Sequence, residues 1–129
     1  GVAVGQAGLL MRTTDGGTTW NELTSPAPTV STYGVRCIDA THSWAVGDNG
    51  TILHTVDGTN WSIQSSPVTH ALFGITFGDA SRGWIVGGEY GSYTGVILHS
   101  TDGGTSWSVQ LGAAPHILYG VSFPNATTG

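Results

Sequence analysis

Short apolar runs rich in valine, isoleucine and tryptophan alternate with glycine and polar residues along the whole chain. The runs are too short for helices, and no stretch shows the periodicity of an amphipathic helix. The glycines, 21 in all, lie beside these runs, as expected for tight turns between strands. The pattern predicts an all-β chain of about twelve short antiparallel strands.

Four kinds of apolar run follow one another in a fixed order, and this order recurs three times. We call the strands of one repeat A, B, C and D. Strand A is predicted at residues 33–38, 73–77 and 119–123, strand B at 2–5, 44–47 and 84–87, and strand C at 9–11, 52–54 and 96–99. Strand D begins at Trp20, Trp61 and Trp107, which are 41 and 46 residues apart. Such spacings match the ~40–50 residues of a four-stranded β-propeller blade.

The repeats are circularly shifted relative to the chain, since a strand B comes first and a strand A comes last. We expect residues 1–129 to form a single three-blade propeller unit. Its first blade takes residues 2–33 and is completed by strand A at 119–123, while the second and third blades take 34–73 and 74–118. Three blades are fewer than the roughly four to eight of a closed ring. We expect a homo-oligomer in which a second copy completes a six-bladed ring, with the remainder of a longer chain as the alternative source of blades.

A polar motif ends in each of the three tryptophans, at residues 13–20, 55–61 and 100–107. Its aspartate can accept backbone N–H bonds inside the tight turn between strands C and D. The glycine two positions later suits a positive φ, and the tryptophan can cover the turn with a large apolar face. These roles are structural and not catalytic. They are assigned to Asp15, Gly17, Trp20, Asp57, Trp61, Asp102, Gly104 and Trp107.

The pattern Thr/Ser-x-Asp-x-Gly-x-Thr/Ser-Trp resembles the Asp-box, also called the bacterial neuraminidase repeat. The larger unit, Gly-Val-x-Phe followed by Gly-Trp-x-Val-Gly and Gly-x-Ile-Leu-His, is most similar to the repeats of the photosystem II stability and assembly factor family. This resemblance implies a β-propeller fold. Members of the wider group serve as assembly factors, carbohydrate-active enzymes and surface modules, and the photosystem role implies binding of a membrane-protein precursor.

Charged residues make up only 9% of the chain, lysine is absent, and the net charge is −5. Nucleic acid is excluded as a partner because phosphate binding needs a dense basic patch. No apolar run approaches the ~20 residues of a membrane-spanning helix, so we expect no membrane insertion. The single cysteine, Cys37, allows no internal disulfide. The composition favours an extracellular or cell-surface protein over a cytoplasmic one.

The residues do not match a known catalytic site. A glycosidase needs two suitably placed carboxylates, and three of the eight acidic residues are the motif aspartates. The Asp-box resemblance brings to mind sialidases, which share an arginine cluster, but Arg12, Arg36 and Arg82 occupy unlike positions in the repeats. His54 and His99 occupy equivalent positions, which favours a scaffold role over a metal site. We therefore predict no catalytic residue, no metal and no cofactor.

Two aromatic regions are the candidate ligand contacts. One is the long hairpin between strands B and C of the third repeat, with Glu89, Tyr90 and Tyr93. The other is the start of strand A, where an aromatic residue recurs at Tyr33, Phe73 and Tyr119. Exposed aromatic faces with few charges suit protein or glycan recognition, although the three strand-A aromatics could instead pack between blades.

These observations predict a non-catalytic binding or scaffold module. The alternatives are a purely structural self-assembling propeller unit, engineered or natural, and a remnant of a sialidase-like glycosidase.

Overall fold

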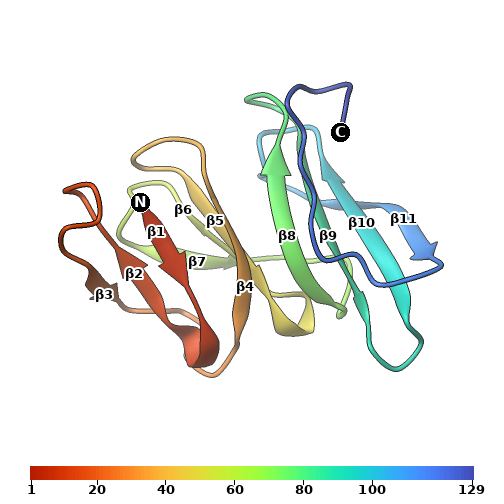
Figure 1. The fold of residues 1–129 in the computed structure, drawn as a ribbon, viewed down its shortest axis with the longest axis horizontal. Helices are drawn as coiled ribbons and strands as arrows, with labels where there is room; N and C mark the ends of the chain where they lie inside the picture. Colours follow the sequence, from red (N-terminus) through yellow and green to blue (C-terminus); the bar gives the residue numbers. More distant parts are fainter.

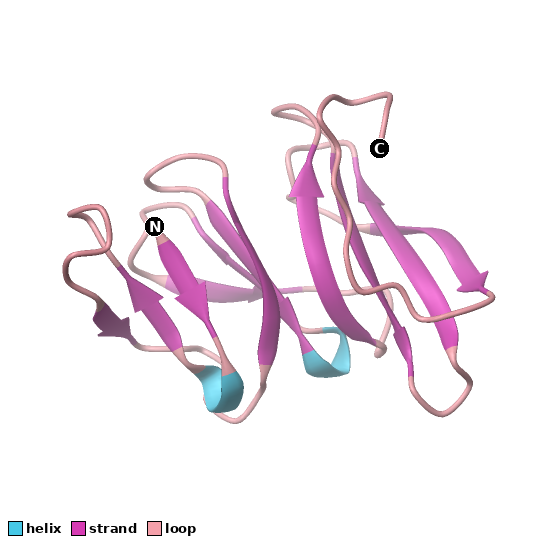
Figure 2. Cartoon of the chain, viewed as in Figure 1, coloured by secondary structure: helices cyan, strands magenta, loops and turns pink.

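The computed structural model describes residues 1–129 and contains eleven β-strands in three antiparallel sheets (Figure 1). Its only helical segments are two single 3-10 turns, η1 (Gln6–Gly8) and η2 (Asp48–Gly50), drawn in cyan in Figure 2. The sheets stand side by side like the blades of a propeller, and strands that follow one another in the chain pair with each other. The predicted all-β propeller architecture is confirmed.

We number the sheets as blades 1 to 3 in chain order. Blade 1 contains β1 (Val2–Val4), β2 (Leu10–Arg12) and β3 (Asn21–Leu23). Blade 2 contains β4 (Thr32–Cys37), β5 (Ser43–Gly47), β6 (Ile52–Thr55) and β7 (Trp61–Gln64). Blade 3 contains β8 (Ala71–Phe77), β9 (Gly83–Glu89), β10 (Thr94–Ser100) and β11 (Ser108–Ala114).

The strand predicted at residues 119–123 is absent, so the chain has eleven strands where about twelve were predicted. The segment runs along β8 without pairing, and a Cβ atom on Gly74 would lie 3.3 Å from both the Gly120 Cα and the Tyr119 carbonyl oxygen. A strand A pairs with the strand B of its own blade. The only strand B that lacks a strand A is β1, which pairs with β2 alone and lies at the far end of the molecule (Figure 1). Without that partner the segment keeps the path of a strand A but not its hydrogen bonds.

The core lies between blades, as predicted. One cluster joins blades 1 and 2 around Leu10, Leu53 and Trp61. A larger one joins blades 2 and 3 around Trp44 and Trp107. A blade is therefore stabilised by apolar contact with its neighbours as well as by the hydrogen bonds of its own sheet.

The joint between blades 2 and 3 also contains specific polar contacts. The Trp44 Nε1 group donates a hydrogen bond to the Gly104 carbonyl oxygen at 3.3 Å, and the Gln64 amide donates to the same oxygen at 3.0 Å. The Trp44 ring packs on Phe77, with ring centroids 4.7 Å apart. On the next joint, Trp84 stacks on Phe123 of the C-terminal segment at 3.7 Å, so that segment covers part of blade 3 as β8 covers part of blade 2.

Candidate functional site

The aspartates of the repeated motif are acceptors within their own turns. Asp102 accepts the Ser106 backbone N–H at 2.9 Å and the Ser106 hydroxyl at 2.6 Å. Asp15 makes the matching bonds with Thr19. Hydrogen bonds from these side-chain hydroxyls, and next from the backbone N–H groups, lower the pKa of both carboxyls to about 2. These carboxylates are engaged in holding the turn.

A buried hydroxyl supports each of these turns from below. Ser100 is 1% exposed, and its Oγ accepts the Gly104 backbone N–H at 2.8 Å while donating to Asp102 Oδ1. Thr13 and Thr55 do the same in the other two turns. This hydroxyl residue was not among the predicted structural residues, although a serine or threonine stands two positions before every motif aspartate.

The tryptophans of the motif differ in burial from blade to blade. Trp61 and Trp107 are each 8% exposed and pack against the preceding blade. Trp20 belongs to blade 1, has no preceding blade in this chain, and is 43% exposed. The motif tryptophan is thus a joint between blades as well as a cover for its turn.

The equivalent histidines lie apart, one in each of two blades. His54 stacks on Trp44 at 4.3 Å and His99 on Trp84 at 4.9 Å between ring centroids. Burial, followed by the charge of His42, lowers the pKa of His54. No three histidine, cysteine or acidic side chains gather into a group that could hold a metal ion.

The strand-A aromatics lie side by side on three consecutive segments. The Phe73 ring centroid is 5.4 Å from that of Tyr33 and 5.1 Å from that of Tyr119. Tyr90, from the long hairpin, meets the Phe73 ring edge-on at 5.9 Å. We call Tyr33, Phe73, Tyr90 and Tyr119 the aromatic row. Its three tyrosines are about half exposed or more, whereas a purely structural aromatic cluster would be covered.

Glycines and β-bulges create the aromatic row. Tyr33 and Phe73 are the extra residues at register shifts against β5 and β9, and such bulges redirect a side chain away from the sheet. A glycine follows each aromatic residue. A Cβ atom on Gly34 would lie 2.7 Å from the Phe73 carbonyl oxygen, so only glycine allows β4 and β8 to approach this closely.

The other hairpin tyrosine does not join the row. Tyr93 is 67% exposed, has a positive φ of 56°, and contacts none of the four rings. Of the predicted hairpin contacts, the structure brings Tyr90 and Glu89 to the row and its surroundings, and leaves Tyr93 aside.

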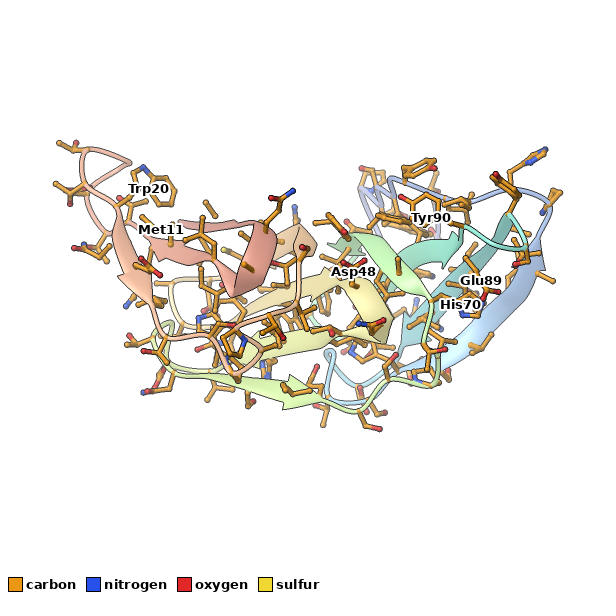
Figure 3. The ribbon with its side chains drawn as sticks, turned by 90° about the horizontal axis from the view of Figure 1, so that it is seen from below. Met11, Trp20, Asp48, His70, Glu89 and Tyr90 are labelled. Carbon is orange, nitrogen blue, oxygen red and sulfur yellow. The ribbon has the colours of Figure 1, made fainter.

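A pocket of about 390 Å³ opens beside the aromatic row, between blades 2 and 3. We call it the inter-blade pocket. It is lined by Asp48, Asn49, Thr69, His70, Ala71, Gly88, Glu89, Tyr90 and Gly91. In Figure 3, His70, Glu89 and Tyr90 lie in the half of the molecule away from Trp20, and Asp48 lies nearer the middle, facing them. The pocket thus combines side chains of η2, of the segment that leads into β8, and of the long hairpin.

Two carboxylates line this pocket. Asp48 Oδ2 accepts the Tyr33 hydroxyl at 2.9 Å, and this bond to a carboxylate raises the pKa of Tyr33. Glu89 accepts the Ser92 hydroxyl at 3.0 Å, and its Oε2 lies 4.0 Å from His70 Nε2. The Nδ1 atom of His70 is buried and has no partner.

Asp48 was not among the predicted contact residues, although a comparison of the repeats distinguishes it. Asp15, Asp57 and Asp102 recur because the turn requires them, whereas the position of Asp48 in blade 1 holds Gln6. Both residues begin the same 3-10 turn, so the turn itself requires no acid. A charge that the fold does not need is a candidate for ligand contact.

A second open pocket lies at the outer strands of blades 1 and 2, beside Glu22, Thr24 and Asn60. Its only aromatic residue, Trp61, is buried, so it offers no exposed ring for stacking. The structure contains no helix long and apolar enough to cross a bilayer.

The three sheets, their repeated joints and the aspartate-centred turns define a β-propeller unit of the Asp-box class. Residues 1–63 match the family model described as photosynthesis system II assembly factor YCF48. The match covers just under half of the chain, so over that stretch the chain is similar to this assembly-factor family.

Among solved structures, nine chains match this one. One of them, "YCF48 bound to D1 peptide", is 24% identical with a TM-score of 0.70, and the match covers 90% of this chain. This chain spans 37% of the length of that one. No curated protein matches the chain.

Proposed function

We propose that the chain is a non-catalytic protein-binding module whose ligand, an extended peptide segment, lies on the aromatic row. The observation that carries this proposal is the row itself. Four rings from four segments gather here: the Phe73 ring lies 5.1 to 5.9 Å from each of the three tyrosine rings, and those three are about half exposed or more. Aromatic faces bury a large area at low entropic cost, which is why they are enriched where proteins bind peptides.

The solved structure that matches this chain supports a peptide as the ligand class, since that protein is described as bound to a peptide. The site chemistry of this chain supports a binding role without catalysis. Five of its six aspartates, Asp15, Asp39, Asp57, Asp79 and Asp102, accept backbone N–H bonds within their own turns. Carboxylates engaged in this way are poorly placed for acid–base work.

Alanine substitution of the exposed row members tests the proposal. A displayed random-peptide library selected on the purified chain supplies ligands, whose affinities are then measured by calorimetry. Tyr119→Ala and Tyr90→Ala are expected to weaken binding about tenfold each, because each removes a stacking surface worth on the order of 1 kcal/mol or more. Neither change should lower the melting temperature much, since both rings are more than half exposed.

Ile63→Ala is the matched control, because Ile63 is 60% exposed on the outer strand β7, away from the aromatic row. It should leave affinity unchanged. Equal affinity of the Tyr119→Ala and unsubstituted chains for every selected peptide would contradict the proposal. Tyr93→Ala tests the remaining hairpin candidate and is expected to have no effect.

A glycan ligand is the second possibility for the same row, because exposed aromatic faces also stack on sugar rings. A glycan array probed in parallel with the peptide library separates the two. Binding to sugars that Tyr119→Ala removes, with no peptide selected, would replace the peptide by a glycan.

We further infer a structural role for the two open blade faces. Trp20 is 43% exposed, whereas Trp61 and Trp107 are buried by a preceding blade. At the other end, Trp84 meets Phe123 but no motif turn, although its equivalent Trp44 donates to Gly104. The open face of blade 1 therefore complements the open face of blade 3.

A second copy of the chain can supply both missing neighbours and close a six-bladed ring, in which residues 119–123 pair with β1 of the other copy. The alternative is further blades from the rest of a longer chain. Light scattering separates them for this chain, whose mass is 13.3 kDa. A species of twice that mass that Trp20→Ser dissociates supports the ring, and a stable monomer at micromolar concentration contradicts it.

A further inference from the structure

The inter-blade pocket carries negative charge with no fixed positive partner. Asp48 enters it from blade 2 and Glu89 from blade 3, and neither arginine nor lysine is among its lining residues. His70 is the only basic side chain there, and its Nε2 is no closer than 4.0 Å to Glu89. Carboxylates on both sides of an open pocket favour a cation as the occupant.

The fold does not require an acidic residue at either position. The position of Asp48 holds Gln6 in blade 1, and Glu89 belongs to the hairpin that is longer than its counterparts in the other repeats. Each accepts one side-chain hydroxyl in the structure, from Tyr33 and Ser92 respectively, and Glu89 is 59% exposed. Both carboxylates therefore keep lone pairs free for a donor on a ligand.

An aromatic ring stands between the charges and the row. Tyr90 lines the inter-blade pocket and is also a member of the aromatic row. A tyrosine face attracts an ammonium or guanidinium group through its quadrupole. A chain that crosses the row therefore passes a place where a positive side chain can reach two carboxylates and an aromatic ring.

We propose that the inter-blade pocket binds a lysine or arginine side chain of the peptide that lies on the aromatic row. This inference rests on the proposed function and names the residue class that its ligand must contain. A free divalent cation fits less well, because two carboxylates supply too few ligands for the roughly six to eight oxygens of calcium. A carboxylate or phosphate on the ligand is repelled.

Capped pentapeptides test the charge requirement directly. They share aromatic residues on either side of a central position, which is arginine, lysine, citrulline or glutamate. Citrulline keeps the shape of arginine and most of its donors but removes the charge. Titration followed by amide chemical shifts of Asn49, Gly88 and Gly91, which line the pocket, reports both affinity and location.

The arginine peptide is expected to bind about fivefold or more tightly than the citrulline peptide, as for exposed charge pairs of up to ~1 kcal/mol each. The glutamate peptide should bind most weakly. Added salt should reduce the difference between arginine and citrulline, because the charges are open to solvent.

Charge-neutralising variants locate the effect. Glu89→Gln and Asp48→Asn are each expected to weaken the arginine peptide about fivefold and leave the citrulline peptide unchanged. Glu22→Gln is the matched control, since Glu22 is the only other glutamate, is exposed, and lies on β3. This substitution changes the net charge of the chain by the same amount and should leave the affinity for both peptides unchanged.

Equal binding of the arginine and citrulline peptides, or an equal loss in Glu22→Gln and Glu89→Gln, would overturn the inference. So would the absence of any arginine-peptide binding at millimolar concentration. If Tyr119→Ala weakens the arginine and citrulline peptides equally while Glu89→Gln weakens neither, the aromatic row stands as the peptide site and only the charge preference fails.

Discussion

A buried serine or threonine hydroxyl anchors each repeated turn. Ser100 Oγ is buried, accepts the Gly104 and Asp102 backbone N–H groups, and donates to the Asp102 carboxylate. The carboxylate in turn accepts from Ser106 at the solvent side of the turn. The turn is therefore one connected network that begins in the core, and its buried end leaves the least room for substitution.

Ser100→Ala should destabilise the chain by about 1–3 kcal/mol, because it leaves the buried Gly104 N–H without an acceptor. The midpoint of urea unfolding measures the loss. Thr105→Ala is the control, since that hydroxyl is exposed and bonds only the Asp102 carbonyl oxygen. Similar losses in the two variants would contradict the network described here.

Acid should destabilise the chain in a defined range of pH. The folded pKa values of Asp15 and Asp102 lie near 2, below their ordinary value of 3.8, so these carboxylates stabilise the fold only when ionised. Their contribution is complete above about pH 4 and is lost as the pH falls towards 2. The urea midpoint should be level from pH 7 to 5 and then decline.

Asp102→Asn provides the check on this pH dependence, since it cannot titrate. The variant should show a shallower decline between pH 4 and pH 2 than the unsubstituted chain. An identical acid profile in both would assign the decline to other groups.

At the scale of the strand, glycine decides how closely successive A strands approach. A Cβ atom on Gly34 would meet backbone of β8, at the Phe73 carbonyl oxygen and at the Gly74 Cα. These backbone atoms cannot move aside as a flexible side chain would. The 5 Å spacing of the aromatic row therefore depends on residues that have no side chain.

Gly34→Ala should push β4 away from β8, lower the melting temperature and weaken peptide binding to the aromatic row. Gly120→Ala occupies the equivalent position in the C-terminal segment, where an added Cβ meets no atom within 4 Å. In the single chain it should leave both properties unchanged. A Gly34→Ala chain with unaltered stability and affinity would show that the strands tolerate a wider spacing.

The strands and turns were predictable where the residues that specify them are close together in the sequence. The paired strands and the motif turns follow from alternating apolar residues and from Asp-Gly sequences. The aromatic row was proposed from its repetition at Tyr33, Phe73 and Tyr119, but its spacing depends on bulges that leave no clear mark in the sequence. Residues 119–123 look like the other A strands, yet a strand also requires a partner, and that partner is remote in the chain. Asp48 escaped notice because Glu89 and Tyr90, which share its pocket, come from another blade.

At the scale of the whole molecule, stability comes from joints between adjacent blades. Each joint combines an apolar cluster with a motif tryptophan of the following blade. Units of this kind contact only their nearest neighbours, so the stability of the array is close to a sum over its joints.

Trp61→Ala should cost about 3–5 kcal/mol, as expected for a large buried ring, because Trp61 is part of the joint between blades 1 and 2. Trp20→Ala should have a much smaller effect on unfolding of the single chain, since no joint exists at that face. Urea unfolding at low protein concentration compares the two, and a loss in Trp20→Ala as large as in Trp61→Ala would contradict this assignment.

The joint between blades determines how the number of repeats can change by gene duplication. The third repeat carries both halves of it, a motif turn that docks onto the blade before and a strand-B tryptophan that faces the blade after. Duplication of the gene segment for one repeat copies the motif turn and the strand-B tryptophan together. The new repeat can therefore pack against the repeat from which it was copied. Unequal recombination that adds or removes a whole repeat therefore keeps every joint complete, whereas a break inside a repeat would separate the two halves.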